Sequence, residues 1–170
     1  MATTSSGPVR LAGLVSLILG VIFILAGGTT WALVTSELSE QNITVSDDAP
    51  FLAGDHVNGP FSAYAEAEVI DMHAKAATEG RTYAELGGLV REAEAAGDTA
   101  LAEELQAQRT TVMNGSFLRA SLFTSVVAFG VSALVIGLGV LLVFQGLAFN
   151  RLASAAAVPA VAPREPAYRD

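Results

Sequence analysis

This 170-residue chain has few side chains that could take part in catalysis or bind a metal, and its two histidines are the main candidates. His56 directly follows Asp55, and His73 comes two residues after Asp71. Two imidazoles and a carboxylate are the ligand set that non-haem iron prefers, and zinc accepts the same donors. The two histidines are separated by seventeen positions and share no helical spacing. The sequence therefore predicts no metal site, no cofactor and no catalytic residue.

Other kinds of catalysis have no better support. The chain has no cysteine, which excludes a thiolate nucleophile, a disulfide and a Cys-ligated metal. No glycine-rich loop follows a strand, so no phosphate cradle is expected. The serines have no histidine and carboxylate arranged to activate them. We expect a protein that is not an enzyme.

Two charge-free stretches dominate the rest of the sequence, residues 11–36 and 120–150. Each exceeds the roughly 20 apolar residues that cross a bilayer core of about 30 Å. They predict an all-α membrane protein, a two-helix transmembrane hairpin with an extracytoplasmic helical cap. We expect a cytoplasmic N-terminus (residues 1–10), a first span (11–34) and an acidic outer loop (35–119). A second span (120–149) and a flexible cytoplasmic tail (150–170) follow.

The basic residues near the span ends set the expected orientation. Arg10, Arg151, Arg164 and Arg169 flank the two termini, which places both termini in the cytoplasm and the protein in the cell membrane. An alternative is that the first stretch is a cleaved signal peptide, although it is longer than the usual apolar region of one. Arg119 lies at the outer edge of the second span, where it either snorkels to the headgroups or pairs with Glu37 or Glu40.

Small residues recur every seven positions in both spans, which keeps them on one face of each helix. Such residues let membrane helices approach closely. We expect close packing along these two faces, against the other span or against a second copy of the chain. The predicted packing positions are Gly13, Ser16, Gly20 and Gly27 in the first span and Ser125, Ser132, Gly139 and Gly146 in the second.

Helical patterns fill most of the outer loop. Phe61, Ala65, Val69, Met72 and Ala76 predict one helix face. A capping box at Thr82 and Glu85 begins a second helix, which ends at Gly97. Asp98 begins a third helix, which either runs into the second span or bends near Gly115. The apolar stripe of the second helix is the candidate partner face, formed by Tyr83, Leu86, Leu89 and Val90. Its alternative cover is Phe61, Val69, Met72 and Leu105 of the same loop.

The outer loop is strongly acidic. Residues 35–119 hold fifteen Asp and Glu against five Lys and Arg, whereas the rest of the chain has a small positive charge. A surface of this sign repels nucleic acid and favours a protein partner with a basic surface. The expected partners are therefore the lipid bilayer and a membrane-protein complex or a second copy of the chain.

Three segments, residues 43–48, 81–86 and 114–131, resemble a family of small two-span actinobacterial membrane proteins. Members of this family often carry the automatic name aromatic ring-opening dioxygenase, small subunit. The resemblance covers most of residues 10–151 and implies the two-span topology. The name would imply iron held by two histidines and a carboxylate, and only His56 and His73 are present to supply the imidazoles.

The sequence favours a structural or accessory membrane subunit whose outer cap contacts a protein partner. The alternative from another class is a metal-dependent, dioxygenase-like enzyme that uses the two histidines. A third reading is a sensor that binds a ligand outside and signals inside, which the absence of an expected cytoplasmic output domain disfavours.

Overall fold

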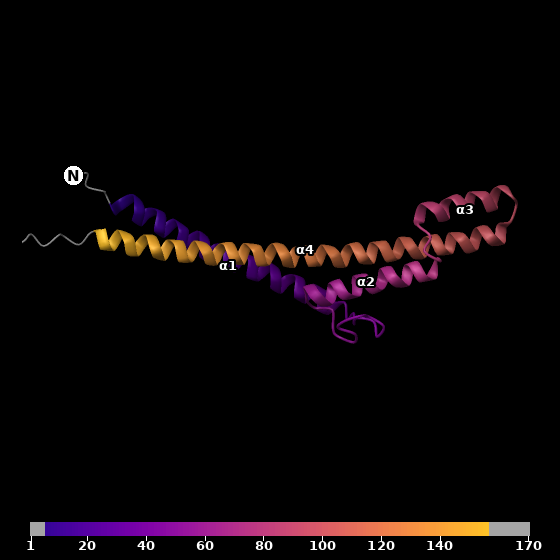
Figure 1. Ribbon diagram of the computed structural model, residues 1–170, viewed down its shortest axis with the longest axis horizontal. Helices are drawn as coiled ribbons and strands as arrows, with labels where there is room; N and C mark the ends of the chain where they lie inside the picture. The colour runs from indigo at the N-terminus through magenta and orange to yellow at the C-terminus, as the bar shows by residue number, and fades with distance from the viewer. Residues whose placement is uncertain (1–5, 157–170) are drawn as a thin grey trace, which may run out of the picture. The chain divides into compact units, whose positions relative to one another are not determined.

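The computed structural model describes residues 6–156, and this part of the chain is all-α. Its four helices are α1 (Ser6–Glu40), α2 (Pro60–Ala77), α3 (Tyr83–Ala95) and α4 (Thr99–Ala156). The helices α1 and α4 are long and apolar enough to cross a membrane. Figure 1 shows the two shorter helices, which lie between them in the sequence. The predicted tail beyond Ala156, including Arg164 and Arg169, lies outside the described residues.

The chain forms two compact units, and α1 and α4 contribute to both. The first unit contains the described residues up to Gly28 and those from Leu134 onward. Here the two helices pair antiparallel, with Gly13 against Gly146 and Gly20 against Gly139. Large apolar side chains point away from this contact, and Leu11, Leu25 and Leu141 are each 64% exposed. The surface of the first unit is thus apolar, whereas its helix contact is made by glycines.

The second unit contains Thr29–Ala133 and has two apolar cores. In the first core, the loop after α1 and the N-terminal half of α2 pack on α1 and α4. Val45 and Val57 come from the loop, and Leu122 and Phe129 come from α4. The Trp31 ring meets Phe129 edge-on, with ring centroids 4.8 Å apart. Leu122 and Phe129 belong to the long charge-free run of α4, so the beginning of that run packs against protein.

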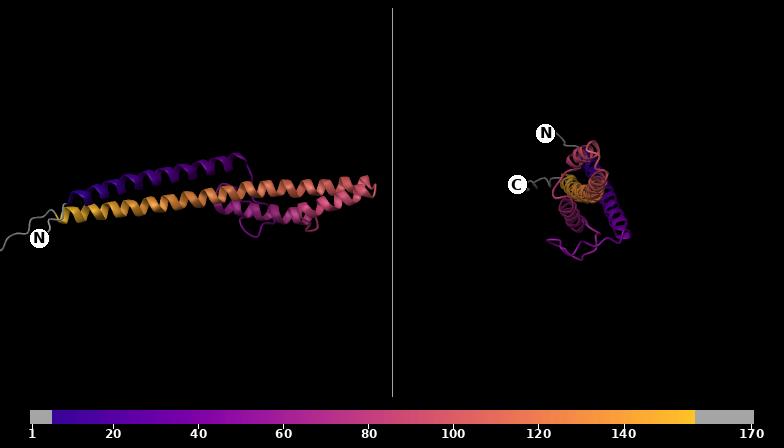
Figure 2. Two further views of the ribbon diagram at one scale, coloured as in Figure 1. Left: turned by 90° about the horizontal axis from the view of Figure 1, so that it is seen from above. Right: turned by 90° about the vertical axis from the view of Figure 1, so that its right-hand side faces the viewer.

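The loop between α1 and α2 is held by a few backbone pairings rather than by a sheet. The one bridge found in the described part of the chain joins Thr44 to His56. Around it, the amide of Val45 donates to the carbonyl of Asp55, and the amide of Val57 donates to that of Ile43. This arrangement turns Val45 and Val57 into the core. Figure 2 shows the loop beside α2 in two further views.

The second core joins α3 to the N-terminal part of α4. Leu86, Val90 and Ala93 of α3 pack on Ala102 and Leu105 of α4. The predicted start of α3 is confirmed, because the Thr82 hydroxyl accepts from the Glu85 amide while the Glu85 carboxylate accepts from Thr82.

The turn between α3 and α4 follows the sequence pattern closely. Gly97 has φ +75°, a left-handed conformation that glycine adopts without strain and that ends helices. The Asp98 carboxylate then accepts from the Leu101 amide at 3.1 Å and caps α4. From there α4 continues through Gly115 to Ala156, so the third helix runs into the second span and is not interrupted at that glycine.

The face that α2 buries differs from the expected one. Ala65 and Val69 are buried as predicted, whereas Phe61 is 76% and Met72 44% exposed. The buried face is instead built of small residues and one carboxylate, namely Ser62, Ala63, Ala65, Glu66, Ala67 and Val69. Small side chains let α2 lie close to α4, which leaves no room for a phenylalanine between the two helices.

Candidate functional site

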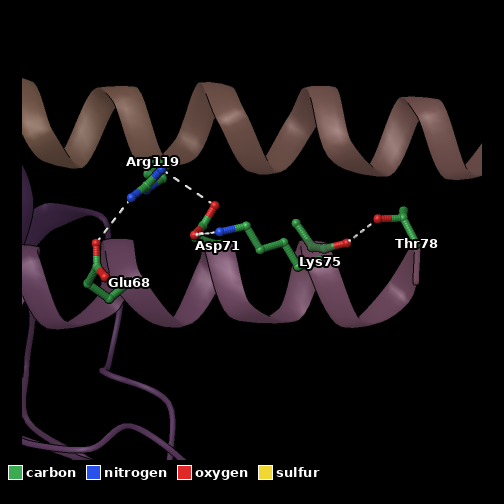
Figure 3. A network of polar contacts seen from close by, with 6 residues as sticks. Glu68, Asp71, Lys75, Thr78 and Arg119 are labelled. Atoms are coloured by element: carbon green, nitrogen blue, oxygen red, sulfur yellow. Dashed lines mark hydrogen bonds and ion pairs between the residues drawn. The ribbon is translucent and has the colours of Figure 1, made fainter. Parts of the chain in front are cut away.

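The most connected polar site of the described chain lies between α2 and α4, around Arg119 (Figure 3). The Arg119 guanidinium contacts Glu68 at 3.2 Å and Asp71 at 3.4 Å, both on α2. Lys75, one turn further along α2, contacts Asp71 at 2.7 Å. The alternative that pairs Arg119 with Glu37 or Glu40 is wrong, because α2 brings the two carboxylates of Glu68 and Asp71 to this level of α4.

Close packing of the backbones produces this arrangement. A methyl group on Gly115 would lie 3.0 Å from the Ala74 side chain, so glycine at this position lets α2 approach α4. One helical turn after Gly115, Arg119 then reaches the α2 carboxylates, and its guanidinium carbon lies 5.2 Å from the centre of the Phe123 ring. The guanidinium therefore joins polar contacts on α2 to an aromatic ring on its own helix.

A cavity of about 460 Å³ opens beside this cluster. Three of the five cations of the acidic loop line it, Lys75, Arg81 and Arg119, together with apolar side chains that include Val112 and Phe123. Each of these cations already contacts a carboxylate within the chain, Arg81 through Glu79. The charges of these three cations are thus compensated within the chain.

A second hollow, of about 600 Å³, lies among α1, α2 and α4 and is mainly apolar. Its lining includes Leu33, Leu38 and Leu122, with the carboxylates Glu37 and Glu66. Glu66 is only 8% exposed, and its carboxylate accepts from the amide of Ser46 at 3.0 Å. This buried carboxylate fastens the loop to α2, which is a structural role.

The two histidines make different contacts in the structure. His73 Nε2 lies 2.7 Å from the Asp48 carboxylate, and this contact holds the pKa of Asp48 below its ordinary value. His56 lies in the bridge to Thr44. Among residues 6–156, no three or more His, Asp or Glu side chains are grouped so that they could hold a metal ion. The His73 side chain thus joins α2 to the loop, whereas His56 takes part in the loop pairing through its backbone.

The small-residue faces meet each other within one chain. A methyl group on Gly20 would lie 2.7 Å from the Gly139 carbonyl oxygen, and one on Gly146 would lie 2.7 Å from that of Gly13. Gly27 is buried as well, and Ser16 and Ser125 are half-buried. The Ser132 hydroxyl, 2% exposed, donates to the Ala128 carbonyl of its own helix at 2.8 Å. For Gly13, Gly20, Gly139 and Gly146, the contact that the sequence left open is thus made with the other long helix.

The candidate partner face on α3 is largely covered by α4. Leu86 is fully buried and Val90 is 8% exposed, and Leu89 packs on the same core. Tyr83 keeps 41% of its surface, with the Arg109 guanidinium carbon 4.0 Å from its ring centre. The stripe therefore needs no external partner to leave water. The expected alternative cover was wrong for Phe61, Val69 and Met72 and right for Leu105, because α3 packs on α4 rather than on α2.

Polar contacts that sequence reasoning missed lie between residues far apart in the chain. Arg119 and Glu68 are 51 positions apart, and His73 and Asp48 are 25 apart. Only the spacing of acidic residues along α2 hinted at the first pairing. No protein-family model, no curated protein and no solved structure matches this chain.

Proposed function

We propose that this chain is a two-span protein of the cytoplasmic membrane, with both termini in the cytoplasm and residues 35–119 outside. The observation that carries this proposal is the surface of the first unit. Many of its large aliphatic side chains are 38–64% exposed, whereas glycines lie where α1 and α4 approach each other most closely. Exposing this apolar surface to water would be unfavourable. Lipid solvates the surface and still permits close packing of the glycines. The resemblance to small actinobacterial two-span proteins agrees with this topology.

The orientation rests on the basic residues beside the two spans. Arg10 and Arg151 flank the cytoplasmic ends, and the outer loop has no Lys or Arg before Lys75. Arg119, the exception at the outer end, has Glu68 and Asp71 as partners, which weakens its pull toward the cytoplasm.

Single cysteines test the orientation cleanly, because the chain has none of its own. Cysteine in place of Ala100, an exposed residue at the start of α4, should react with an impermeant maleimide in intact cells. Cysteine in place of Ser154, exposed near the end of α4, should react only after the membrane is opened. The reverse pattern would overturn the orientation, and labelling of both in intact cells would overturn the two-span topology.

We further propose that the protein acts as an accessory subunit whose outer region binds a partner with a basic surface. The support is charge, since fifteen acidic residues against five basic ones give this region a strongly negative field. Fields of this kind govern encounter rate and specificity more than affinity. The α3 stripe contributes less than the sequence suggested, because Leu86 and Val90 are occupied by the chain itself.

Crosslinking in native membranes tests the partner proposal. A photo-reactive residue in place of Arg91, which is exposed on α3, should give a product larger than the monomer. The same residue in place of Gly87 is the internal control, because that position faces Arg109 and should crosslink only within the chain. Absence of any larger product from several exposed positions of α3 and α4 would remove the partner proposal and leave the topology untouched.

A further inference from the structure

Exposed aromatic side chains gather at the N-terminal end of α2. Phe61 is 76% exposed, although it is one of the largest apolar residues of the second unit. Tyr64, 42% exposed, lies one turn later, and Phe51 of the preceding loop, 39% exposed, has its ring centre 6.3 Å from that of Tyr64. Leaving three aromatic rings in water is costly, since each could bury a large apolar area.

The antiparallel packing of α2 on α4 shows which residues of α4 lie level with these aromatic side chains. The two helices are antiparallel, because Ala74 faces Gly115, Glu68 reaches Arg119 and the Tyr64 ring meets Phe123 edge-on at 5.7 Å. Figure 1 shows α2 beside α4 over this length. The N-terminal end of α2 thus points toward the charge-free half of α4.

Phe61 lies deeper than Tyr64 by this register. It precedes Tyr64 by three residues, which is about 4.5 Å along a helix. This places it near the level of Val126 and Val127, and Val127 is itself 63% exposed. Phe61 is therefore at a level where α4 already presents an apolar surface without charges.

The first turn of α2 carries no charge, as expected for a segment that lies level with the apolar residues of α4. It reads Pro60, Phe61, Ser62 and Ala63, and it contains no acidic residue. Helices that begin in water commonly place Asp or Glu there, because a negative charge is stabilised at the N-terminus. In α2 the first carboxylate is Glu66, which is turned inward to Ser46. The end of the helix is uncharged in a region that is otherwise strongly acidic.

We propose that the N-terminal end of α2 inserts into the headgroup layer of the outer leaflet, with Phe61 as the deepest anchor and Tyr64 and Phe51 above it. This inference rests on the proposed two-span topology. It adds that the outer region is fastened to the lipid surface rather than standing free in water. Aromatic rings prefer this layer because one side of it is apolar and the other is wet.

The position of the patch beside the charge-free part of α4 favours lipid as its cover. The exposed rings continue the apolar surface of α4, where Val127 and Val131 are exposed and where the bilayer must begin. The acidic loop beside the patch, with Asp47, Asp48 and Asp55, repels anionic headgroups, so the rings rather than charge hold the contact. The patch therefore fits a zwitterionic lipid surface.

Nitroxide spin labels on single cysteines test the inference in the full chain, reconstituted in phosphatidylcholine vesicles. Cysteine replaces Phe61 in the test variant. Matched controls carry it in place of Ile22, 51% exposed within the first span, and in place of Leu101, 43% exposed at the start of α4. Oxygen concentrates in lipid and a nickel chelate stays in water, so collision of the label with each reagent reports its surroundings.

We expect the nickel-to-oxygen collision ratio at position 61 to be several-fold lower than at 101 and to approach that at 22. An equal collision ratio at positions 61 and 101 would overturn the inference. If the ratio at position 22 were still that of a label in lipid, the two-span topology would stand. A label at 61 shielded from both reagents would also overturn it, since protein would then cover the patch. Water-like values at 22 would instead refute the membrane topology itself.

Discussion

At the scale of single residues, the polar groups of the outer region serve mainly to fix its chain path. His73 ties the loop at Asp48 to α2, Glu66 ties Ser46 to α2, and Arg119 ties α4 to Glu68. Each contact joins segments that are far apart in the sequence. The two ion pairs, at His73 and Arg119, are partly exposed and contribute little to stability, so their main effect is to favour one arrangement of the chain.

Acid should release the contact between Asp48 and His73. The hydrogen bond from His73 lowers the pKa of Asp48, so the contact stabilises the fold above the ordinary pKa of an aspartate and is lost as pH falls through the lowered pKa. A carboxyl titration followed by NMR should give a midpoint for Asp48 below that of an ordinary aspartate, and His73→Ala should raise it toward the ordinary value. An unchanged midpoint in this variant would contradict the contact.

Removing both imidazoles tests the enzyme alternative. His56→Ala with His73→Ala should leave folding nearly unchanged and should not alter bound metal, because neither histidine lies in a group of metal ligands among the described residues. Metal analysis of the purified protein checks this expectation. One equivalent of iron or zinc that disappears in the double variant would contradict it and restore the dioxygenase-like hypothesis.

At the scale of elements, the sequence predicts features that depend on neighbouring residues, and it does not predict those that depend on contacts between distant segments. The start of α3 at Thr82 and its end near Gly97 follow from capping chemistry within four residues, and both predictions are confirmed. The buried face of α2 was predicted wrongly, because its cover comes from Val45 and Val57 of a loop whose path no periodicity reveals. Apolar spacing suggested that Phe61 was buried, whereas only the packing partner decides which side of a helix is inside.

The glycine contact between α1 and α4 should be sensitive to bulk. Gly139→Leu would place side-chain atoms where the Gly20 carbonyl lies, and overpacking of this kind costs about 1–3 kcal/mol. Thermal unfolding in mild detergent should show the loss. Gly137→Leu is the matched control, because a side chain there meets open space. Equal stability of both variants would contradict the close contact.

The capping box of α3 gives a second element-scale prediction. Thr82→Ala should cost about 1 kcal/mol, because the N-cap side chain no longer accepts from the Glu85 amide. Amide hydrogen exchange in α3 should quicken by about fivefold, which is that free energy expressed as a rate ratio. Thr110→Ala should have little effect, since that hydroxyl only donates to a carbonyl of its own helix. Similar exchange in both variants would contradict the cap.

At the scale of the whole molecule, the composition alone indicated two apolar helices, and the structure contains them as α1 and α4. The length of the second charge-free run was harder to interpret. A run of about thirty residues exceeds the roughly 20 that a bilayer core requires. The structure shows that Leu122 and Phe129 in this run pack into the core of the second unit.

The first apolar stretch should remain in the mature protein. Removing it as a signal peptide would take away Gly13 and Gly20 and leave Gly146 and Gly139 without their contacts. Intact mass measurement of protein from the native membrane should therefore include the residues before Trp31. A mature chain that begins near Trp31 would contradict both the retained span and the glycine contact.

The fifteen carboxylates described above also shape the solution around the molecule. A strongly anionic surface gathers an ionic atmosphere of protons and cations that extends over roughly one Debye length, about 8–10 Å at physiological salt. Within that layer the local concentration of divalent metal ions and of basic proteins exceeds the bulk value, and anions are depleted. Added salt thins the layer, so the rate at which a basic protein arrives at this surface should fall as ionic strength rises.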